Sequence, residues 1–332
     1  MLRLIAAFSL ALLIALSPAR AAPLAVDTVL GDWTDTARAN RDVPFKIYFP
    51  PEAQGARPVV IFSHGLGGNR DGAEYLLRFL AENGYVAVAV QHPGSDTPSV
   101  FGELAANGGG GADFDRSTLP SKLKDSISPQ AAAERFRDIP FAITQLEAMN
   151  AGDPKLRGHL DMSRVGMSGH SFGAITTMAL SGQSMAGGRM SFGDPRIRAS
   201  IAYSPSKPRA GDPAQAFATI RIPTFHMTGT QDTTPFDAGQ PPENRQIPYR
   251  NITGADKYLV VFNGGDHMIF SGRTPRAGPR PNDDKFHALI QKASLAYWDA
   301  YLMNNKDAKA YLAGGGFAKD LGATGTFEFQ AR

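Results

Sequence analysis

Residues 169–173 read Gly-His-Ser-Phe-Gly and fit the pattern G-x-S-x-G. The pattern lies between a short apolar run and a helical stretch, which is the context in which it presents a serine nucleophile. A side chain at Gly169 or Gly173 would clash with the sharp turn, and the turn holds the Ser171 hydroxyl above the sheet. We therefore predict that Ser171 is a nucleophile and that Ser168 packs in the core. The alternative is a glycine-rich turn without chemistry.

A serine nucleophile needs a general base within hydrogen-bond reach. His267 lies in a loop directly after the last predicted strand, at the sheet edge where Ser171 is also expected. His170 is nearer in the sequence, but it lies inside the turn itself. We predict His267 as the base and structural roles for most of the other histidines, which are His64, His92, His159, His170, His226 and His287.

A third group should orient the histidine, and in this context it follows the serine and precedes the histidine in the chain. Asp232 comes just after the predicted strand at 222–230. Its carboxylate would hold the Nδ1–H group of His267 and stabilise the imidazolium that forms. Asp266 is the rival, although neighbours in a sequence rarely face one another. A turn residue that bonds its own backbone is the other reading of Asp232.

Two backbone N–H groups are expected to stabilise a tetrahedral oxyanion. One comes from the residue after the nucleophile and the other from a loop that follows an earlier strand. Here that loop reads Ser-His-Gly-Leu-Gly-Gly at 63–68, and its glycines let the main chain approach a substrate closely. We predict the N–H groups of Leu66 and Phe172 as the donors. The alternative for the loop is a simple strand-ending turn.

Short apolar runs alternate with helical stretches, which indicates an α/β fold with a mainly parallel sheet covered by helices on both faces. The predicted strands lie at 44–50, 57–65, 85–94, 164–169, 197–205, 222–230 and 257–265. The predicted helices lie at 70–83, 129–150, 172–182 and 282–304. Pro140 is expected to kink or split the second of them.

The mature chain is expected to form one domain, because no internal repeat or second unit is visible in residues 22–332. Residues 95–128, with the glycine run 108–111, are too long for a routine connection. They follow a strand at its catalytic edge. We therefore expect them to be a cover insertion over the site.

The first 21 residues have the layout of a secretory signal peptide. A basic tip at Arg3 precedes an apolar run at 4–16, and small residues precede an expected cleavage after Ala21. The apolar run is too short for a membrane span, which needs about 20 apolar residues. Removal of residues 1–21 takes away Arg3 and Arg20 and lowers the formal charge from +3 to +1. Such a nearly neutral chain is not expected to bind nucleic acid.

The chain contains no cysteine. This excludes a disulfide framework, a lipoprotein anchor on an N-terminal cysteine, a cysteine nucleophile and a cysteine-ligated metal site. Together with the export signal, it indicates a secreted or periplasmic protein, of bacterial origin and without a stable membrane anchor.

The segments "SHGLGG", "GHSFG", "GTQD" and "GGDH" together resemble those of the α/β-hydrolase superfamily. "IFSHGLGGNR", "VAVAVQHPGSD" and "GHSFGAITT" are more narrowly similar to the platelet-activating factor acetylhydrolase and predicted dienelactone hydrolase group. The resemblance covers roughly residues 40–305. It implies an α/β-hydrolase fold and a serine esterase of carboxylic esters, with Ser171 as nucleophile, His267 as base and the Leu66 and Phe172 N–H groups as oxyanion donors.

The chain departs from the acetylhydrolase branch at the acid. That branch takes its acid after the strand before the one that ends near Thr230, where this chain reads "IAYSPS" with Ser204 and no carboxylate. The acid is therefore expected from Asp232, and a specific claim for acetylhydrolase substrates is weakened. True dienelactone hydrolases use a cysteine nucleophile, which this chain lacks.

These features predict an exported serine hydrolase that cleaves a small-molecule or lipid-like carboxylic ester through an acyl-enzyme. The reaction needs no metal and no organic cofactor. Two alternatives stay open. One is an amidase or peptidase on the same triad, and the other is a catalytically silent binding protein of the same fold.

Overall fold

The computed structural model describes residues 22–102, 119–234, 241–272 and 278–332. Among these residues, nine strands form one sheet in the order β1-β2-β4-β3-β5-β6-β7-β8-β9. The block from β4 to β8 is parallel, whereas β1, β2 and β9 run antiparallel to their neighbours. The strands are β1 (Asp27–Asp35), β2 (Arg41–Phe49), β3 (Arg57–Ser63), β4 (Val86–Val90), β5 (Leu160–His170), β6 (Ile197–Tyr203), β7 (Thr224–Gln231), β8 (Lys257–Asp266) and β9 (Gly325–Gln330).

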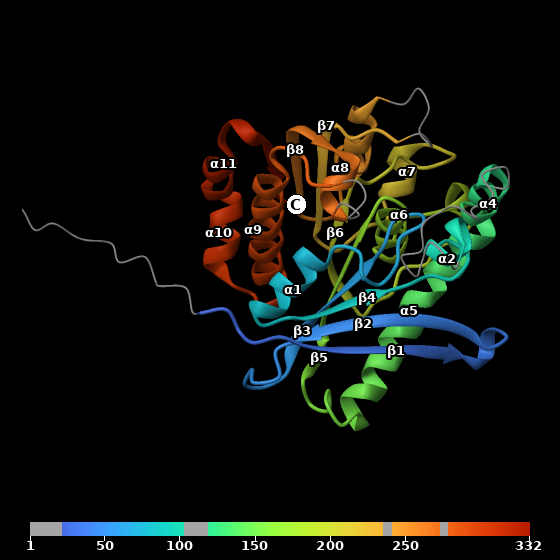
Figure 1. Ribbon diagram of the computed structural model, residues 1–332. Helices are drawn as coiled ribbons and strands as arrows, with labels where there is room; N and C mark the ends of the chain where they lie inside the picture. The colour runs from blue at the N-terminus through green and yellow to red at the C-terminus, as the bar shows by residue number, and fades with distance from the viewer. Residues whose placement is uncertain (1–21, 103–118, 235–240, 273–277) are drawn as a thin grey trace, which may run out of the picture.

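Helices cover both faces of the sheet, as the sequence predicts (Figure 1). Helices α1 and α9 pack on one face, and α5 and α6 pack on the other. The helices are α1 (Glu74–Glu82), α2 (Thr97–Phe101), α4 (Leu119–Ser126), α5 (Pro129–Gly152), α6 (Phe172–Leu180), α7 (Pro213–Phe217), α8 (Ile247–Asn251), α9 (Asp283–Leu302), α10 (Lys306–Ala313) and α11 (Gly316–Leu321).

The apolar runs of the sequence become strands that are buried on both faces. In β3, Val59 and Ile61 pack in the core under α5 and α6, while Val60 and Phe62 pack in the core under α1 and α9. Successive side chains of a strand point to opposite faces, so a strand covered on both sides must be apolar at every position. The parallel block brings the carboxyl ends of its strands to a single edge, where the site is expected.

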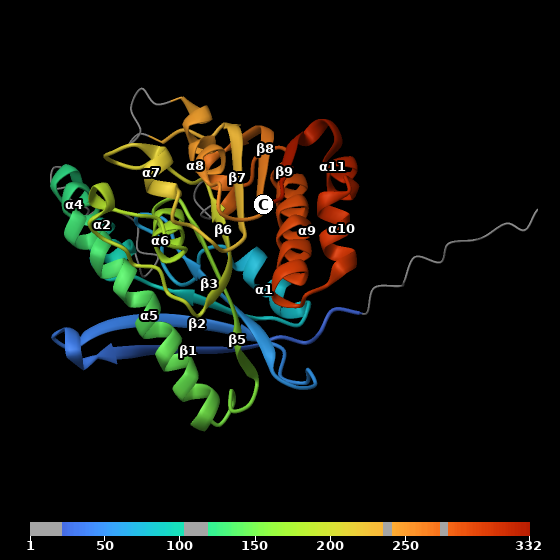
Figure 2. The same ribbon diagram turned by 180° about the vertical axis from the view of Figure 1, so that it is seen from behind.

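The C-terminal end of the fold differs from the prediction. The run at 257–265 was expected to be the last strand and the helix at 282–304 the closing element, but α10, α11 and β9 follow them. Strands β1 and β9 lie at the two ends of the sheet, each with one neighbour (Figure 2). Their sequences mix polar and apolar residues because they are only partly buried. Such short, half-polar segments carry a weak sequence signal.

Two helices also differ in detail from the prediction. Helix α1 begins at Glu74 rather than at residue 70. Helix α5 is not split at Pro140 and runs on to Gly152. Apolar side chains before and after the proline, such as Ile139 and Ile143, are buried in the same core, which favours one continuous helix over two separate ones.

Some predictions fall outside the described residues. The expected signal peptide at 1–21 does so entirely, and the expected cover at 95–128 does so for residues 103–118, which include the glycine run. Helices α2 and α4 occupy the described ends of that insertion. In the part of the chain that the structure describes, no helix is both long and apolar enough to cross a membrane.

Burial of several histidines predicts a pH-dependent stability. Burial lowers the pKa of His226 from its ordinary value of 6.5 to about 4. The unfolded chain therefore binds a proton between pH 6.5 and 4 that the folded chain does not, and stability falls as the pH drops through this window. Burial also lowers the pKa values of His64, His92 and His170, with the same sign. We expect the melting temperature, measured by calorimetry, to fall between pH 6.5 and 4.

Replacement of one of these histidines should reduce the fall. His226 is fully buried in β7, and its Nε2 atom has no hydrogen-bond partner among the described residues. His226→Leu should therefore give a smaller drop of the melting temperature over the same pH window. The matched control is Thr224→Val, a buried position of the same strand without a titratable group, which should keep the wild-type drop. An unchanged drop in His226→Leu would contradict the linkage.

Candidate active site

Ser171 lies in a strained turn between β5 and α6. Its backbone has φ 57° and ψ −113°, a conformation that residues other than glycine rarely adopt. An added Cβ at Gly169 would lie 2.4 Å from the carbonyl oxygen of Gly173, and one at Gly173 would lie 1.8 Å from the carbonyl oxygen of Ser63. The two glycines of the motif are therefore required by close backbone packing, as the sequence predicts.

Gly173→Ala should destabilise the fold and misplace the nucleophile. The new methyl group has no room against the β3 backbone, so the turn must move. We expect the free energy of unfolding, measured in urea, to fall by about 3 kcal/mol. The matched control is Gly152→Ala at the end of α5, where an added Cβ meets nothing within 4 Å. Stability equal to that of the control would contradict the tight packing.

Three side chains from three strand ends form one hydrogen-bonded chain. The Nε2 atom of His267 lies 2.9 Å from Ser171 Oγ, and its Nδ1 atom lies 2.7 Å from Asp232 Oδ1. Asp232 directly follows β7, and His267 directly follows β8. When Nδ1 carries the proton that Asp232 accepts, Nε2 is left to accept the Ser171 hydroxyl proton. The structure thus brings together the three residues that the sequence singled out.

The Asp232 carboxylate is buried and held from several sides. Besides His267, it accepts hydrogen bonds from Ser204 Oγ (2.8 Å) and Thr228 Oγ1 (2.8 Å), and Arg245 Nε lies 3.4 Å away. Burial alone raises the pKa of this carboxyl group, but the hydrogen bond and charge of His267 and the charge of Arg245 outweigh it. The net pKa lies below the ordinary value. The group is therefore ionised at neutral pH, as an orienting acid must be.

Ser204 is a site residue whose role the sequence did not predict. Its hydroxyl lies 2.9 Å from His267 Nδ1 as well as 2.8 Å from Asp232 Oδ1. It stands at the end of β6, the place where the sequence comparison expected an acid and found none. The hydroxyl bridges the histidine and the carboxylate at this place. The backbone of Ser204 has a positive φ of 54°, which turns its side chain toward His267 and Asp232. The sequence does not predict this backbone angle.

The rival residues have other partners. Asp266 Oδ1 accepts the Met268 N–H group at 2.9 Å, and Oδ2 pairs with Arg280 at 2.5 Å. His170 is buried, and its Nε2 atom lies 2.8 Å from the carbonyl oxygen of His267. Burial and the neighbouring His267 lower the pKa of His170 to about 3, so it stays neutral. Neither residue occupies the position of the acid or the base.

Ser168 packs as predicted. It is buried in β5, and its hydroxyl donates to the carbonyl oxygen of Ile61 at 2.9 Å. The second serine of the motif region is therefore a core residue that satisfies its own hydrogen bond within the sheet.

The loop after β3 lies against the serine turn. An added Cβ at Gly65 would contact the Ser171 Cβ atom at 3.3 Å. The carbonyl oxygen of Gly65 lies 2.6 Å from His64 Nδ1, and His64 Nε2 accepts the His92 N–H group at 3.1 Å. His64 is therefore neutral with its proton on Nδ1. Because C=O and N–H point in opposite directions in a trans peptide, this bond directs the Leu66 N–H group away from His64.

Phe172 offers the second predicted donor. It is the first residue of α6, so its N–H group has no acceptor within the helix. The N-terminal end of a helix also carries partial positive charge. The Phe172 N–H group therefore lies directly after Ser171, at the positive end of α6. The sequence predicted only a structural role for His64, and the structure places its ring against the carbonyl group of Gly65 in the loop after β3. Its position next to Gly65 was the one sequence signal for this contact.

Known proteins of one hydrolase family are similar to this chain in sequence. A family model described as platelet-activating factor acetylhydrolase, isoform II, matches residues 22–228. This chain belongs to that family. Within the acetylhydrolase family, the guinea pig (Cavia porcellus) platelet-activating factor acetylhydrolase is 24% identical to it over 307 residues. The aligned region covers 86% of this chain but 66% of the guinea pig protein, slightly less than two thirds.

The matched family region includes Leu66, Ser171 and Phe172 and ends before Asp232 and His267. Membership of the acetylhydrolase family therefore agrees with the resemblance drawn from the sequence and with the α/β-hydrolase fold. No group of three or more His, Cys, Asp or Glu side chains within the described ranges is placed to hold a metal ion.

Proposed function

We propose that this chain is a serine hydrolase that cleaves carboxylic esters through a covalent acyl-enzyme on Ser171. One observation carries the proposal. It is the hydrogen-bonded chain from Asp232 through His267 to Ser171, at the carboxyl edge of a parallel sheet. Membership of the acetylhydrolase family supports an ester as the substrate class.

In the proposed reaction, His267 Nε2 takes the hydroxyl proton of Ser171 as Oγ attacks the ester carbonyl carbon. The carbonyl oxygen becomes an oxyanion that accepts hydrogen bonds from the Leu66 and Phe172 N–H groups. The C–O bond then breaks, and His267 gives its proton to the leaving alcohol. A water molecule, deprotonated by the same histidine, attacks the acyl-enzyme and releases the carboxylic acid. Asp232 stays ionised and stabilises the imidazolium.

An apolar pocket supports an assignment for part of the substrate. It has a volume of about 250 Å³ and lies between α5, α6 and two loops beside Phe172. Phe136, Ile175, Met185 and Phe192 are among its lining side chains. An engineered apolar cavity of about 150 Å³ holds a benzene molecule. We propose that this pocket takes an acyl chain of intermediate length.

The proposal is tested with purified protein and p-nitrophenyl esters from acetate to dodecanoate. A fluorophosphonate titrates the reactive serine, so that kcat is obtained per active site. We expect labelling of Ser171 and steady turnover that is faster on esters than on matched p-nitroanilides. Faster turnover of the anilides would favour an amidase. The absence of both turnover and labelling would leave only a silent binding protein.

The pocket assignment has its own variant. Ala133 lines the pocket, and Ala133→Phe should fill part of it. We expect turnover of octanoate to fall by about tenfold relative to acetate, because the pocket loses room for the chain. Ala131→Phe, on the same helix but not among the lining residues, is the matched control. If Ala133→Phe leaves the dependence of turnover on acyl-chain length unchanged, the acyl chain does not bind in this pocket.

We also propose that residues 1–21 direct export and that residues 22–332 form the mature domain. The family match begins at residue 22, directly after the expected cleavage site, and this supports the division. Expression of the whole chain in a bacterial host tests it. Mass spectrometry of the product should find a new N-terminus at Ala22 outside the cytoplasm. An uncleaved product inside the cells would contradict the proposal.

A further inference from the structure

Arg135, on α5, places a buried cation next to the proposed oxyanion hole. Its side chain is fully buried. The guanidinium donates hydrogen bonds to Ser95 Oγ at 2.9 Å, to Ser63 Oγ at 2.9 Å and to the carbonyl oxygen of His64. It also donates to Thr176 Oγ1 on α6 at 3.3 Å. One side chain thus connects the end of β3 and the loop after β4 with the helix that follows Ser171.

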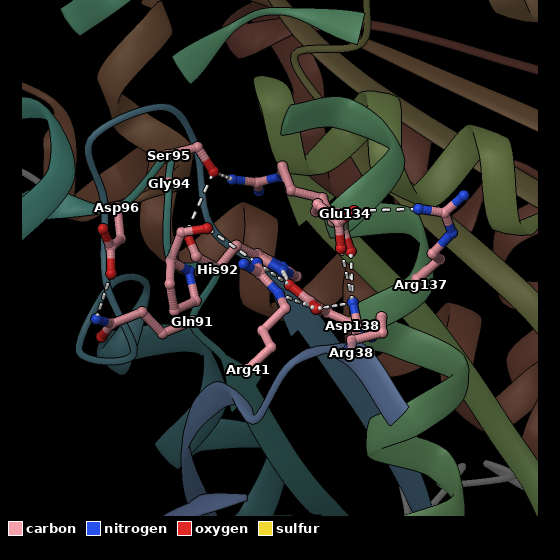
Figure 3. A network of polar contacts seen from close by, with 12 residues as sticks. Arg38, Arg41, Gln91, His92, Gly94, Ser95, Asp96, Glu134, Arg137 and Asp138 are labelled. Carbon is pink, nitrogen blue, oxygen red and sulfur yellow. Dashed lines mark hydrogen bonds and ion pairs between the residues drawn. The ribbon is translucent and has the colours of Figure 1, made fainter. Parts of the chain in front are cut away.

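The charge of Arg135 is not neutralised by a direct ion pair within the described part of the chain. Asp138, one turn further along α5, is held by Arg38, Arg41 and His92 instead (Figure 3). Burial lowers the pKa of Arg135 to about 9, which leaves the side chain protonated at neutral pH. Removal of an ion from water is unfavourable unless its surroundings compensate. The four residues to which Arg135 donates supply hydrogen bonds rather than a counter-charge.

Arg135 reaches both halves of the proposed oxyanion hole. Its hydrogen bond to the His64 carbonyl holds the start of the loop that carries the Leu66 N–H group. Its central carbon lies 4.5 Å from the centre of the Phe172 ring, and a cation over an aromatic face is attracted to it. The carbonyl groups of His64 and Gly65 are both bound on the protein side. The N–H groups of these two peptides, which belong to Gly65 and Leu66, face the opposite way from the bound carbonyls.

A buried array behind Arg135 fixes the guanidinium. Ser63 Oγ lies 2.9 Å from His92 Nε2, and His92 Nδ1 lies 3.0 Å from Asp138 Oδ2. This array has the composition of a catalytic triad, but all three side chains are fully buried, so no substrate reaches Ser63. The Ser63 hydroxyl accepts a hydrogen bond from Arg135 and donates one to His92 Nε2. His92 in turn donates its Nδ1–H group to the Asp138 carboxylate. The array anchors Arg135.

We propose that Arg135 is a positioning residue for the oxyanion hole. The guanidinium ties the loop after β3 to the start of α6 and sets the spacing between the Leu66 and Phe172 N–H groups. Its charge adds to the positive potential where the oxyanion forms, in a site whose charged groups are already in place before reaction. The inference rests on the proposed ester hydrolysis but not on which ester is the natural substrate.

The experiment compares Arg135→Met, Arg135→Lys and the control Arg137→Met. Arg137 lies two residues further on, is half exposed and pairs with Glu134. All proteins are titrated with the fluorophosphonate, and kcat and KM for p-nitrophenyl butyrate are taken per active site. A trifluoromethyl ketone serves as a second probe, because its adduct with a serine carries an oxyanion.

Arg135→Met should lower kcat by about 100-fold, the effect of losing one oxyanion donor, with little change in KM. The inhibition constant of the ketone should rise by a similar factor, because both report on the oxyanion. Arg135→Lys keeps the charge but not the planar set of N–H donors, and we expect kcat to fall by about tenfold. Arg137→Met should behave as wild type. A merely structural role would lower the titrated fraction but not the rate of each titrated site.

A kcat per titrated site within about threefold of wild type in the Arg135 variants would overturn the inference and leave the ester hydrolase proposal standing. If Arg135→Met fails to fold, Arg135→Lys decides by the same criterion. If the wild-type protein turns over no ester at all, the proposed function fails and this inference fails with it.

Discussion

Ser171→Ala is expected to lower kcat for p-nitrophenyl butyrate by about 10⁶-fold, because the nucleophile is lost. The hydroxyl is the group that His267 can deprotonate at 2.9 Å, and alanine offers no atom for an acyl-enzyme. Fluorophosphonate labelling should disappear with the activity. The measurement is steady-state hydrolysis at matched concentrations of folded protein, together with mass spectrometry of the labelled chain.

The control is another serine of the same segment. Ser168→Ala removes a buried hydroxyl that bonds to the Ile61 carbonyl and should cost about 1 kcal/mol of unfolding free energy while activity stays. If Ser171→Ala keeps more than about one hundredth of the wild-type rate, the covalent mechanism is wrong. If both variants lose activity together, the cause is the turn rather than the nucleophile.

Asp232→Asn is expected to lower kcat by about 10⁴-fold, because an amide can stabilise the wrong tautomer of the histidine. The amide of an asparagine at 232 can donate a hydrogen bond to Nδ1 of His267, and the imidazole proton then lies on Nε2. A protonated Nε2 atom cannot accept the Ser171 hydroxyl proton. KM should change little, since the carboxylate is buried away from substrate. Steady-state hydrolysis of p-nitrophenyl butyrate, with kcat taken per titrated serine, measures both constants.

Asp266→Asn is the matched control for this carboxylate. Asp266 caps the turn after β8 and pairs with Arg280, so its loss should affect local stability and leave kcat within about threefold of wild type. Equal, near-normal rates in the two variants would remove Asp232 from the triad. A larger loss in Asp266→Asn than in Asp232→Asn would exchange their roles.

The sequence predicted the central fold well because the parallel strands have a strong signal. A strand such as β3 is covered on both faces, so nearly every residue in it must be apolar. The edge strand β9 reads "GTFEFQ" and is only partly buried, and the prediction ended before it. Its place is decided by pairing with β8, a contact that no local pattern reports. The α/β-hydrolase prediction is confirmed.

The site was predictable where topology alone decides position. Ser171, Asp232 and His267 each follow a parallel strand, and parallel strands end at one edge. The catalytic roles stay predictions that the variants above test. Ser204 and Arg135 could not be found in this way. The first depends on a backbone angle, and the second on a helix that brings a guanidinium under a loop 71 residues earlier in the chain.

The hairpin of β1 and β2 is needed by a helix that is distant in the sequence, so its removal from the protein should be costly. Arg38 and Arg41 lie at its turn, and both bind the buried carboxylate of Asp138 on α5. An edge hairpin is often dispensable, but removal of this one would strip two cations from a carboxylate that water does not reach. Loss of one partner from a buried pair typically costs about 3–5 kcal/mol. A shortened chain that starts at β3 would therefore lose the charge balance of the helix that carries Arg135.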